Sequence, residues 1–302
     1  MKKKLLIVMA ASAVFLAACG AKKIEPSAPI ELSAADVLNT EILETQEEAV
    51  RDISLLGDRA EFSCGGVKAS GAVVTITAPG EYRLSGELRE GQIIVDTGSA
   101  PEKVNIILNG VSLSNSSDAA FFVKQAEKVN IKLASGTENR ITSGTEEMMA
   151  AADDSASGAA IVAKDDIDIK GDGKLLVFGY INNGISCKND IDIDEGEITV
   201  VAANNGIKGE YSVEINGGTV SVNCGNDALK STCIDRQDKG FVKIEGGVVS
   251  LTARGDGISA EKDVIVNAGE LIISAAKKPL KSISGEIRVD ENVAKVVILD
   301  DN

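Results

Sequence analysis

Two sets of carboxylate and amide side chains recur at regular spacing, and both have the chemistry to coordinate a hard cation. The first set lies in a short turn that recurs 22, 22 and 29 residues apart, at Asn183, Asn205, Asp227 and Asp256. Carboxylate and amide oxygens are the ligands that Ca²⁺ prefers. A second set lies further along each repeat, at Asp166, Asp190, Ser212, Phe241 and Asp263, with Asp165 and Asn189 one step earlier. The sequence therefore predicts calcium ligands among Asp165, Asp166, Asn183, Asn189, Asp190, Asn205, Asp227, Asp256 and Asp263.

Three other interpretations compete with a metal site. Asn and Asp before Gly are ordinary turn formers. Stacked amides, such as Asn182, Asn204 and Asn226, can form hydrogen-bonded ladders that hold turns without a ligand. Lys208 and Lys230, again 22 residues apart, could neutralise nearby acids in place of a metal. Together with Arg254, these lysines are also the candidates for contacting a sugar or for acting as a base.

The elements that position these side chains follow from the repeat itself. Each repeat of about 22 residues holds three short apolar runs separated by turn residues, and most runs alternate apolar and polar residues. Period-two alternation indicates strands. One such strand cannot bury its apolar face alone, but stacked repeats can bury these faces inside one tube. The pattern predicts an all-β, single-stranded parallel β-helix in which Ile185, Ile207, Leu229, Ile258 and Leu280 form one interior row.

The tube is expected to extend in both directions from the regular repeats. A long loop is expected from Thr142 to Ser157, and a cap on the open end from Ile287 to Leu299, since an open end exposes a strand edge. The strands expected upstream are Val73 to Ile76, Tyr82 to Leu84, Gln92 to Val95, Val104 to Leu108 and Val129 to Leu133.

The N-terminal residues predict export and a lipid anchor. Three lysines precede an apolar run from Leu5 to Leu16, which is too short to span a bilayer as a helix and has the layout of a secretory signal. The run ends in Leu16-Ala17-Ala18-Cys19-Gly20, which resembles a bacterial lipobox; the alternative is an ordinary signal peptide with a chance cysteine. We expect a signal peptide over 1–18, a lipidated Cys19 and flexible tether over 19–49, and a β-helix domain over 50–302. The expected location is the outer side of the cell membrane.

The amino-acid composition limits the kinds of partner that the chain is expected to bind. Removing the three lysines of residues 1–18 takes the formal net charge from −15 to −18. A chain this acidic is not expected to bind nucleic acid, whose phosphates need clustered Lys and Arg. With no histidine and no CxxC motif, a zinc site is not expected either. Four further cysteines, Cys64, Cys187, Cys224 and Cys233, could pair outside the cell or stay as buried thiols.

The combined motifs resemble a family of exported clostridial-type β-helix proteins described as carbohydrate-binding domains with a pectate-lyase-like fold. The resemblance spans about Asp52 to Leu299, and it implies a right-handed helix, Ca²⁺ binding and an association with plant cell-wall polysaccharides, including cellulose and acidic pectin. Asn at 183 and 205 departs from the family's acidic turns, so calcium sites there should be weaker or absent. The motifs are Tyr82-Arg83-Leu84-Ser85-Gly86, Asn105-Ile106-Ile107-Leu108-Asn109-Gly110-Val111, Lys164-Asp165-Asp166-Ile167-Asp168-Ile169-Lys170-Gly171 and the (Asn/Asp)-Gly-Ile turns.

Three functions fit these residues. The first is a non-catalytic surface module that binds polysaccharide, either acidic and bridged by Ca²⁺ or cellulose-like. The absence of Trp weakens the neutral version, because flat sugar-binding faces need stacking rings. The second is a polysaccharide lyase, but the fold alone supplies no base. The third is a structural or adhesive surface protein without a glycan ligand.

Overall fold

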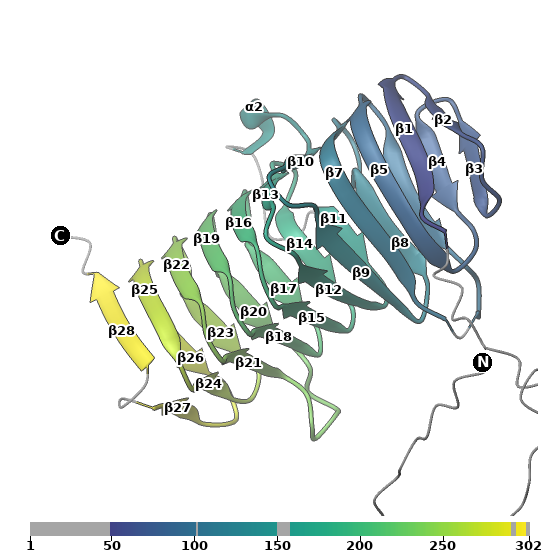
Figure 1. The fold of residues 1–302 in the computed structure, drawn as a ribbon. Helices are drawn as coiled ribbons and strands as arrows, with labels where there is room; N and C mark the ends of the chain where they lie inside the picture. The colour runs from purple at the N-terminus through teal and green to yellow at the C-terminus, as the bar shows by residue number, and fades with distance from the viewer. Residues whose placement is uncertain (1–48, 101, 150–157, 291–293, 300–302) are drawn as a thin grey trace, which may run out of the picture. The chain divides into compact units, whose positions relative to one another are not determined.

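The predicted parallel β-helix is confirmed by the structure, a computed structural model that describes residues 49–100, 102–149, 158–290 and 294–299 (Figure 1). Each coil of the helix passes through three faces, and the equivalent strands of successive coils pair in parallel. The strands of the first and second faces join into one 18-stranded sheet, and the third face is a separate 10-stranded sheet. Among the described residues, no helix is long and apolar enough to cross a membrane.

The first face consists of β9 (Lys128–Leu133), β12 (Asp166–Lys170), β15 (Asp190–Ile193), β18 (Ser212–Ile215), β21 (Phe241–Ile244), β24 (Val264–Val266) and β27 (Ile287–Val289). The second face consists of β10 (Glu138–Ser143), β13 (Lys174–Gly179), β16 (Glu197–Ala202), β19 (Thr219–Cys224), β22 (Val248–Ala253), β25 (Gly269–Ala275) and β28 (Ala294–Leu299). The third face consists of β4 (Val73–Ile76), β6 (Gln92–Asp96), β8 (Phe121–Gln125), β11 (Ala159–Ala163), β14 (Asn183–Cys187), β17 (Ile207–Gly209), β20 (Leu229–Ser231), β23 (Ile258–Ala260) and β26 (Leu280–Ser282). The long strands β5 (Gly80–Leu88) and β7 (Val104–Asn115) run through both the first and second faces of their coils.

The interior row predicted from the repeat is present in the expected register. Ile185 pairs with Ile207, Ile207 with Leu229, Leu229 with Ile258, and Ile258 with Leu280. The first four are fully buried, whereas Leu280 is half-buried in the last coil of this face. The alternation of apolar and polar residues thus places one side of every strand in a continuous core.

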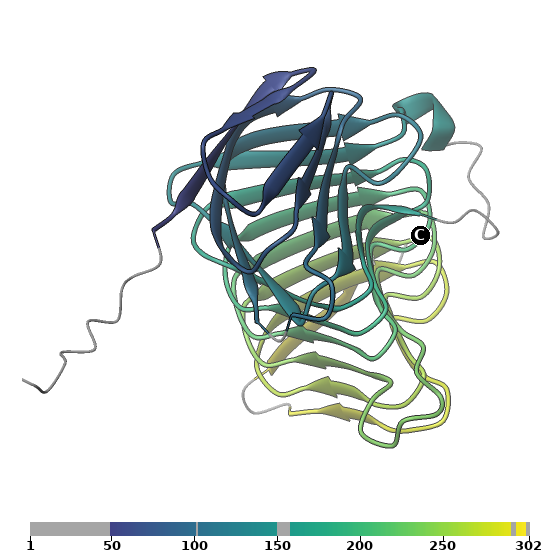
Figure 2. The ribbon, with the colours of Figure 1, turned by 90° about the vertical axis from the view of Figure 1, so that its right-hand side faces the viewer.

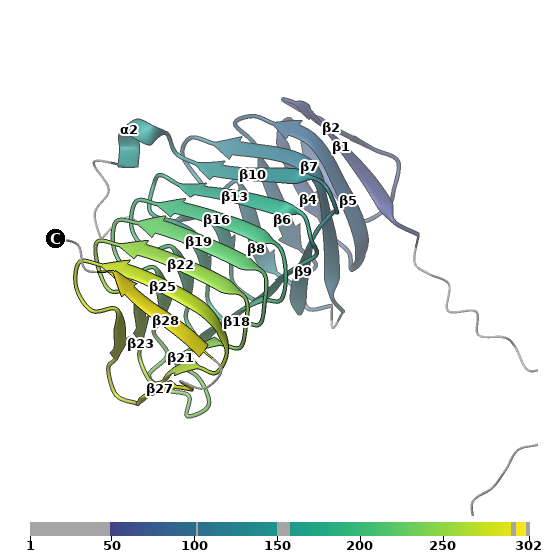
Figure 3. The same cartoon turned by 60° about the vertical axis from the view of Figure 1, so that its left-hand side comes forward.

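The two ends of the helix differ. At the N-terminal end, β1 (Arg51–Gly57) pairs antiparallel with β2 (Ala60–Phe62), and β3 (Val67–Ser70) pairs antiparallel with β4, so extra strands cover the first coil (Figure 2). At the other end, β27 and β28 continue the parallel ladders (Figure 3). Ile287 and Ile298 of these strands are exposed, so this last coil extends the tube rather than folding over it as the predicted cap.

One further expectation needs adjustment, and one open alternative is decided. The segment expected as a loop from Thr142 to Ser157 begins with the end of β10 and contains a short helix, α2 (Glu146–Met149); residues 150–157 lie outside the described residues. The four cysteines beyond the anchor are free thiols, and Cys187, Cys224 and Cys233 are buried.

The signal peptide, Cys19 and almost all of the tether lie outside the described residues, and β1 begins inside the predicted domain.

Candidate functional site

A hydrogen-bonded ladder runs along the turn between the second and third faces. We define the ladder as Asn183, Asn205, Asp227 and Asp256, all at least nine-tenths buried. The backbone N–H of each residue donates to the Oδ1 atom of the preceding one, at 3.1 Å for Asn205, 3.3 Å for Asp227 and 2.8 Å for Asp256. The N–H of Lys278 continues the series with a 3.0 Å bond to Asp256. The first predicted set therefore stacks as expected, and each side chain satisfies a buried backbone donor of the next coil.

The two ladder carboxylates each meet a lysine at their second oxygen. Lys230 Nζ lies 2.8 Å from Asp227 Oδ2, and Lys281 Nζ lies 2.8 Å from Asp256 Oδ2. Burial alone would raise the pKa of Asp256, but the hydrogen bonds from Lys281 and from the Lys278 N–H outweigh it and hold that pKa below its ordinary value. Each oxygen of the two carboxylates thus has a protein donor, and each carboxylate has a lysine partner.

A polar groove of about 460 Å³ lies beside the ladder on the third face. The side chains that give it its chemistry are Asn182, Asn204, Asn226, Ser186, Lys208 and Lys230. The Oδ1 atom of Asn204 is buried and accepts no hydrogen bond from the residues that the structure describes. A buried, unpaired acceptor is costly, and a ligand hydroxyl that reached this oxygen would remove that cost.

Lys208 is the surplus cation of this groove. Ser186, Lys208, Lys230, Ser259 and Lys281 form one in-register row beside the ladder, which supplies three lysines for two ladder carboxylates. The side chain beside Lys208 is Asn205 rather than an acid, and within the described chain Lys208 makes no ion pair. Burial, together with the charges of Lys230 and Lys188, lowers the pKa of Lys208. The arrangement is suited to an anionic group of a ligand.

The second predicted set also stacks, at the start of the first face. Asp190 pairs with Ser212 and Ser212 with Phe241 in the strand register. Asp190 accepts a 2.6 Å hydrogen bond from Ser212 Oγ and lies 2.7 Å from Lys239 Nζ. Burial, with the adjacent charge of Asp190 adding to it, raises the pKa of Asp166. This region is therefore crowded with negative charge, which Lys239 offsets in part.

Asp165 and Asp263, the other acids of the second predicted set, each have partners of their own. The Oδ2 atom of Asp165 accepts the N–H of Ala126 at 2.9 Å. Asp263 accepts the N–H of Glu286 and lies 2.8 Å from an Arg288 nitrogen, and it is four coils away from Asp166. Asp263 is thus engaged within its own coil and the next, and it is not brought together with the other acids.

Calcium fits these two sets unequally. At the ladder, a lysine already offsets the charge of each carboxylate and each oxygen already accepts from a protein donor, so the ladder fits a cation poorly. Near Asp166, Asp190, Asp165 and Asn189, closely spaced carboxylates carry only one lysine, which fits a hard cation better. Even so, no three or more His, Cys, Asp or Glu side chains in the described ranges surround a common point, so Asn189, carbonyls and water would have to supply the remaining ligands.

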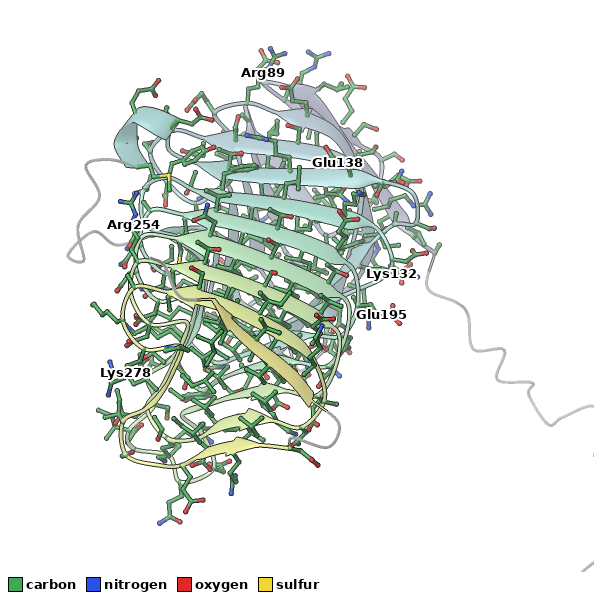
Figure 4. The ribbon with its side chains drawn as sticks, turned by 90° about the vertical axis from the view of Figure 1, so that its left-hand side faces the viewer. Arg89, Lys132, Glu138, Glu195, Arg254 and Lys278 are labelled. Atoms are coloured by element: carbon green, nitrogen blue, oxygen red, sulfur yellow. The ribbon has the colours of Figure 1, made fainter. Side chains whose placement is uncertain are left out.

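The third sugar-contact candidate, Arg254, lies apart from the groove. It lines a separate hollow of about 370 Å³ with Glu146 and Asn223, and Figure 4 shows it on the same edge of the helix as Lys278. Of the three predicted contacts, the structure brings Lys208 and Lys230 together and leaves Arg254 out.

Few aromatic rings are open to a ligand in the described part of the chain. One of them, the half-buried Phe122 of β8, lies in register with Val162 of the groove wall, and Lys164 Nζ lies 5.7 Å from its ring centroid. Tyr82 and Tyr180 are buried, the guanidinium of Arg236 lies 4.6 Å from the ring centroid of Tyr211, and that of Arg140 lies 3.8 Å from the centroid of Phe178. No aromatic side chain of the described residues lines the groove itself, so a sugar inside it would be held mainly by hydrogen bonds and charge.

Sequence reasoning missed two lysines in these sites. Lys281 follows Lys230 by the same 51 residues that separate Leu280 from Leu229, so the repeat frame already contained its position. Lys239 lies in the seven-residue insertion between two repeats, which carries no periodic signal. The hydrogen-bonded column was also expected at Asn182, Asn204 and Asn226, whereas the side-chain bonds run mainly through the residues immediately after them.

Comparisons with known proteins agree with the parallel β-helix described above. A solved structure described as the polysaccharide lyase-like protein from C. thermocellum, a gadolinium derivative, is 35% identical with a TM-score of 0.75, covering 82% of this chain and all of that one. A carbohydrate-binding domain-containing protein of Acetivibrio thermocellus is 40% identical over 281 residues, 93% of each chain. The model of the family described as carbohydrate-binding domain-containing protein matches residues 70–295. The chain belongs to this family.

Proposed function

We propose that this chain is a non-catalytic polysaccharide-binding protein, held on the outer side of the cell membrane by a lipid on Cys19. The observation that carries the proposal is the groove beside the ladder, where stacked amides lie next to the surplus ammonium of Lys208. Stacked coils repeat at about 4.8 Å, a spacing comparable to that of a sugar unit, so the groove suits a polymer.

An acidic polysaccharide fits the groove better than a cellulose-like one. A carboxylate on the sugar would pair with Lys208, and its hydroxyls would donate to acceptors such as Asn204 Oδ1. A neutral, flat polymer would lack the ring stacking that usually holds it. Binding through an ammonium also explains how a chain of formal net charge −15 can hold an anionic ligand.

Calcium remains part of the proposal at the second set alone. The acids near Asp166 and Asp190 are the arrangement that a hard cation would stabilise, and the solved relative is described as a gadolinium derivative. If Ca²⁺ binds there, the melting temperature of the full chain should rise with free Ca²⁺, and Asp190→Asn should reduce that rise.

The binding proposal is tested by calorimetry with oligogalacturonate and, separately, with cello-oligosaccharide of equal length. We expect the acidic oligomer to bind more tightly, and Lys208→Gln to weaken it about tenfold, as expected for the loss of a charged hydrogen bond. Lys174→Gln is the matched control, because it removes an equal charge from the second face, where Lys174 pairs with Glu197. Equal weakening by both variants, or tighter binding of the neutral oligomer, would contradict the proposal.

A lyase is the second candidate, and one observation favours it. The lowered pKa of Lys208, caused by burial and by neighbouring lysines, is the property that a general base needs. The same protein sample distinguishes the two functions. Formation of an unsaturated product from polygalacturonate, lost in Lys208→Gln, would make the groove an active site; binding without turnover would leave it a binding site.

A further inference from the structure

We call each ladder residue a rung. The ladder contains neutral Asn rungs and acidic Asp rungs, and a lysine accompanies only the acidic ones. In both kinds, Oδ1 accepts a backbone N–H from the next coil. The second atom differs: the Nδ2 atom of Asn205 donates to Asn183 Oδ1 at 2.9 Å, whereas the Oδ2 atoms of Asp227 and Asp256 meet ammonium groups. A neutral rung is complete by itself, and an acidic rung is complete only with a cation.

A buried carboxylate without a counter-charge is strongly unfavourable. The side chains of Asp227 and Asp256 are only 6% and 4% exposed, and each lies 2.8 Å from a lysine nitrogen. We infer that Lys230 and Lys281 are built-in counter-ions that stand at the ladder in place of a metal ion, so that the ladder needs no divalent cation. The inference concerns the ladder and does not depend on which ligand the groove binds.

The two lysines reach their acids by different routes, which argues that the pairing itself is the common feature. Lys230 belongs to the same coil as Asp227, three residues further on. The equivalent position beside Asp256 is Ser259, and the ammonium there comes instead from Lys281 of the next coil. If the contact between Lys230 and Asp227 reflected only the local shape of one turn, a lysine from another coil would not be expected at Asp256.

It follows that an Asp with a lysine and an Asn without one are interchangeable rungs. Lys230→Gln should leave a buried carboxylate uncompensated and lower the melting temperature of the full chain by roughly 6–12 °C in chelator. Adding Asp227→Asn to that variant should restore most of the loss, because it recreates the neutral rung found at 205. Millimolar Ca²⁺ should raise the melting temperature of Lys230→Gln more than that of the unmodified chain.

Lys208→Gln is the matched control, since Lys208 lies in the same row but has no ladder acid to neutralise. It should leave the melting temperature nearly unchanged and gain no additional response to Ca²⁺. Asp227→Asn alone should also melt close to the unmodified chain, which keeps the test valid if Lys230→Gln does not fold. The inference is overturned if Lys230→Gln melts like the control, or if the unmodified chain is stabilised by Ca²⁺ and Asp227→Asn abolishes that stabilisation.

Discussion

At the residue scale, adjacent asparagines in one turn have opposite roles. Asn205 points into the ladder, where its Oδ1 accepts the N–H of Asp227 and its Nδ2 donates to Asn183. Asn204 lies in the groove with a buried oxygen that has no donor among the described residues. One side chain therefore stabilises the fold, and the other keeps an unpaired oxygen beside the groove.

This division predicts different effects of the same substitution at the two positions. Asn205→Ala should destabilise the protein by about 2–4 kcal/mol, because it leaves a buried N–H unsatisfied and opens a small cavity. Asn204→Ala should change the free energy of unfolding by less than about 1 kcal/mol, because its Oδ1 has no bond to lose, yet weaken glycan binding several-fold. Urea denaturation and calorimetry on both variants measure this. Equal destabilisation by the two would show that the ladder is not confined to 183, 205, 227 and 256.

At the element scale, the neighbouring strands β12 and β15 place two carboxylates opposite each other on the first face. Asp168 pairs in register with Asp192, and Lys128 Nζ lies 2.6 Å from the first and 3.4 Å from the second. Burial and the neighbouring Asp168 raise the pKa of Asp192 to about 7, with the charge of Glu214 adding to the effect and that of Lys128 opposing it. The folded protein therefore holds a proton that the unfolded chain releases near pH 4.

Stability should consequently fall as the pH rises from about 4 to about 7, and level off above that range. The expected loss is about 1–2 kcal/mol, reduced by the partial exposure of Asp192 and by Lys128. Urea midpoints measured in chelator from pH 5 to pH 8.5 test this. Asp192→Asn should flatten the curve, whereas Glu197→Gln, at an exposed ion pair on the second face, should leave its slope unchanged. A curve that rises with pH would contradict the account.

The strands were largely predictable because each obeys a local rule. The alternation of apolar and polar residues located β12 to β26, and Gly218 and Gly247 mark turns with φ of +78° and +81°, which residues with a Cβ rarely adopt. The β2 and β3 strands that cover the first coil were not predicted, because they occur once and have no repeat to reveal them. The partners of the acids were harder still, since Lys239 and Lys281 reach across coils.

At the scale of the whole molecule, stacking converts a repeated turn into a continuous surface. The ladder, the row from Ser186 to Lys281 and the interior row run in parallel along the helix, each with one member per coil. A ligand that spans several coils would contact equivalent groups in turn, and the charge of that surface changes along the row, since Lys208 is surplus and its neighbours are paired. The proposed anionic ligand would thereby be directed to the coil that carries Lys208.

The proposed anchor makes a prediction at this scale. Cys19→Ser should prevent acylation and so lower the share of the protein recovered in the membrane fraction, because the proposed lipid is then missing. Fractionation followed by immunoblotting measures this. Retention of the variant in the membrane fraction would show that something other than a lipid on Cys19 holds it there.

The most direct test of the central claim is a crystal structure of the chain with an oligogalacturonate. The account predicts a sugar chain lying along the third face, with one carboxylate within hydrogen-bonding distance of Lys208 Nζ and a hydroxyl donating to Asn204 Oδ1. A sugar chain bound on the second face, or in the hollow at Arg254 with the groove empty, would contradict it.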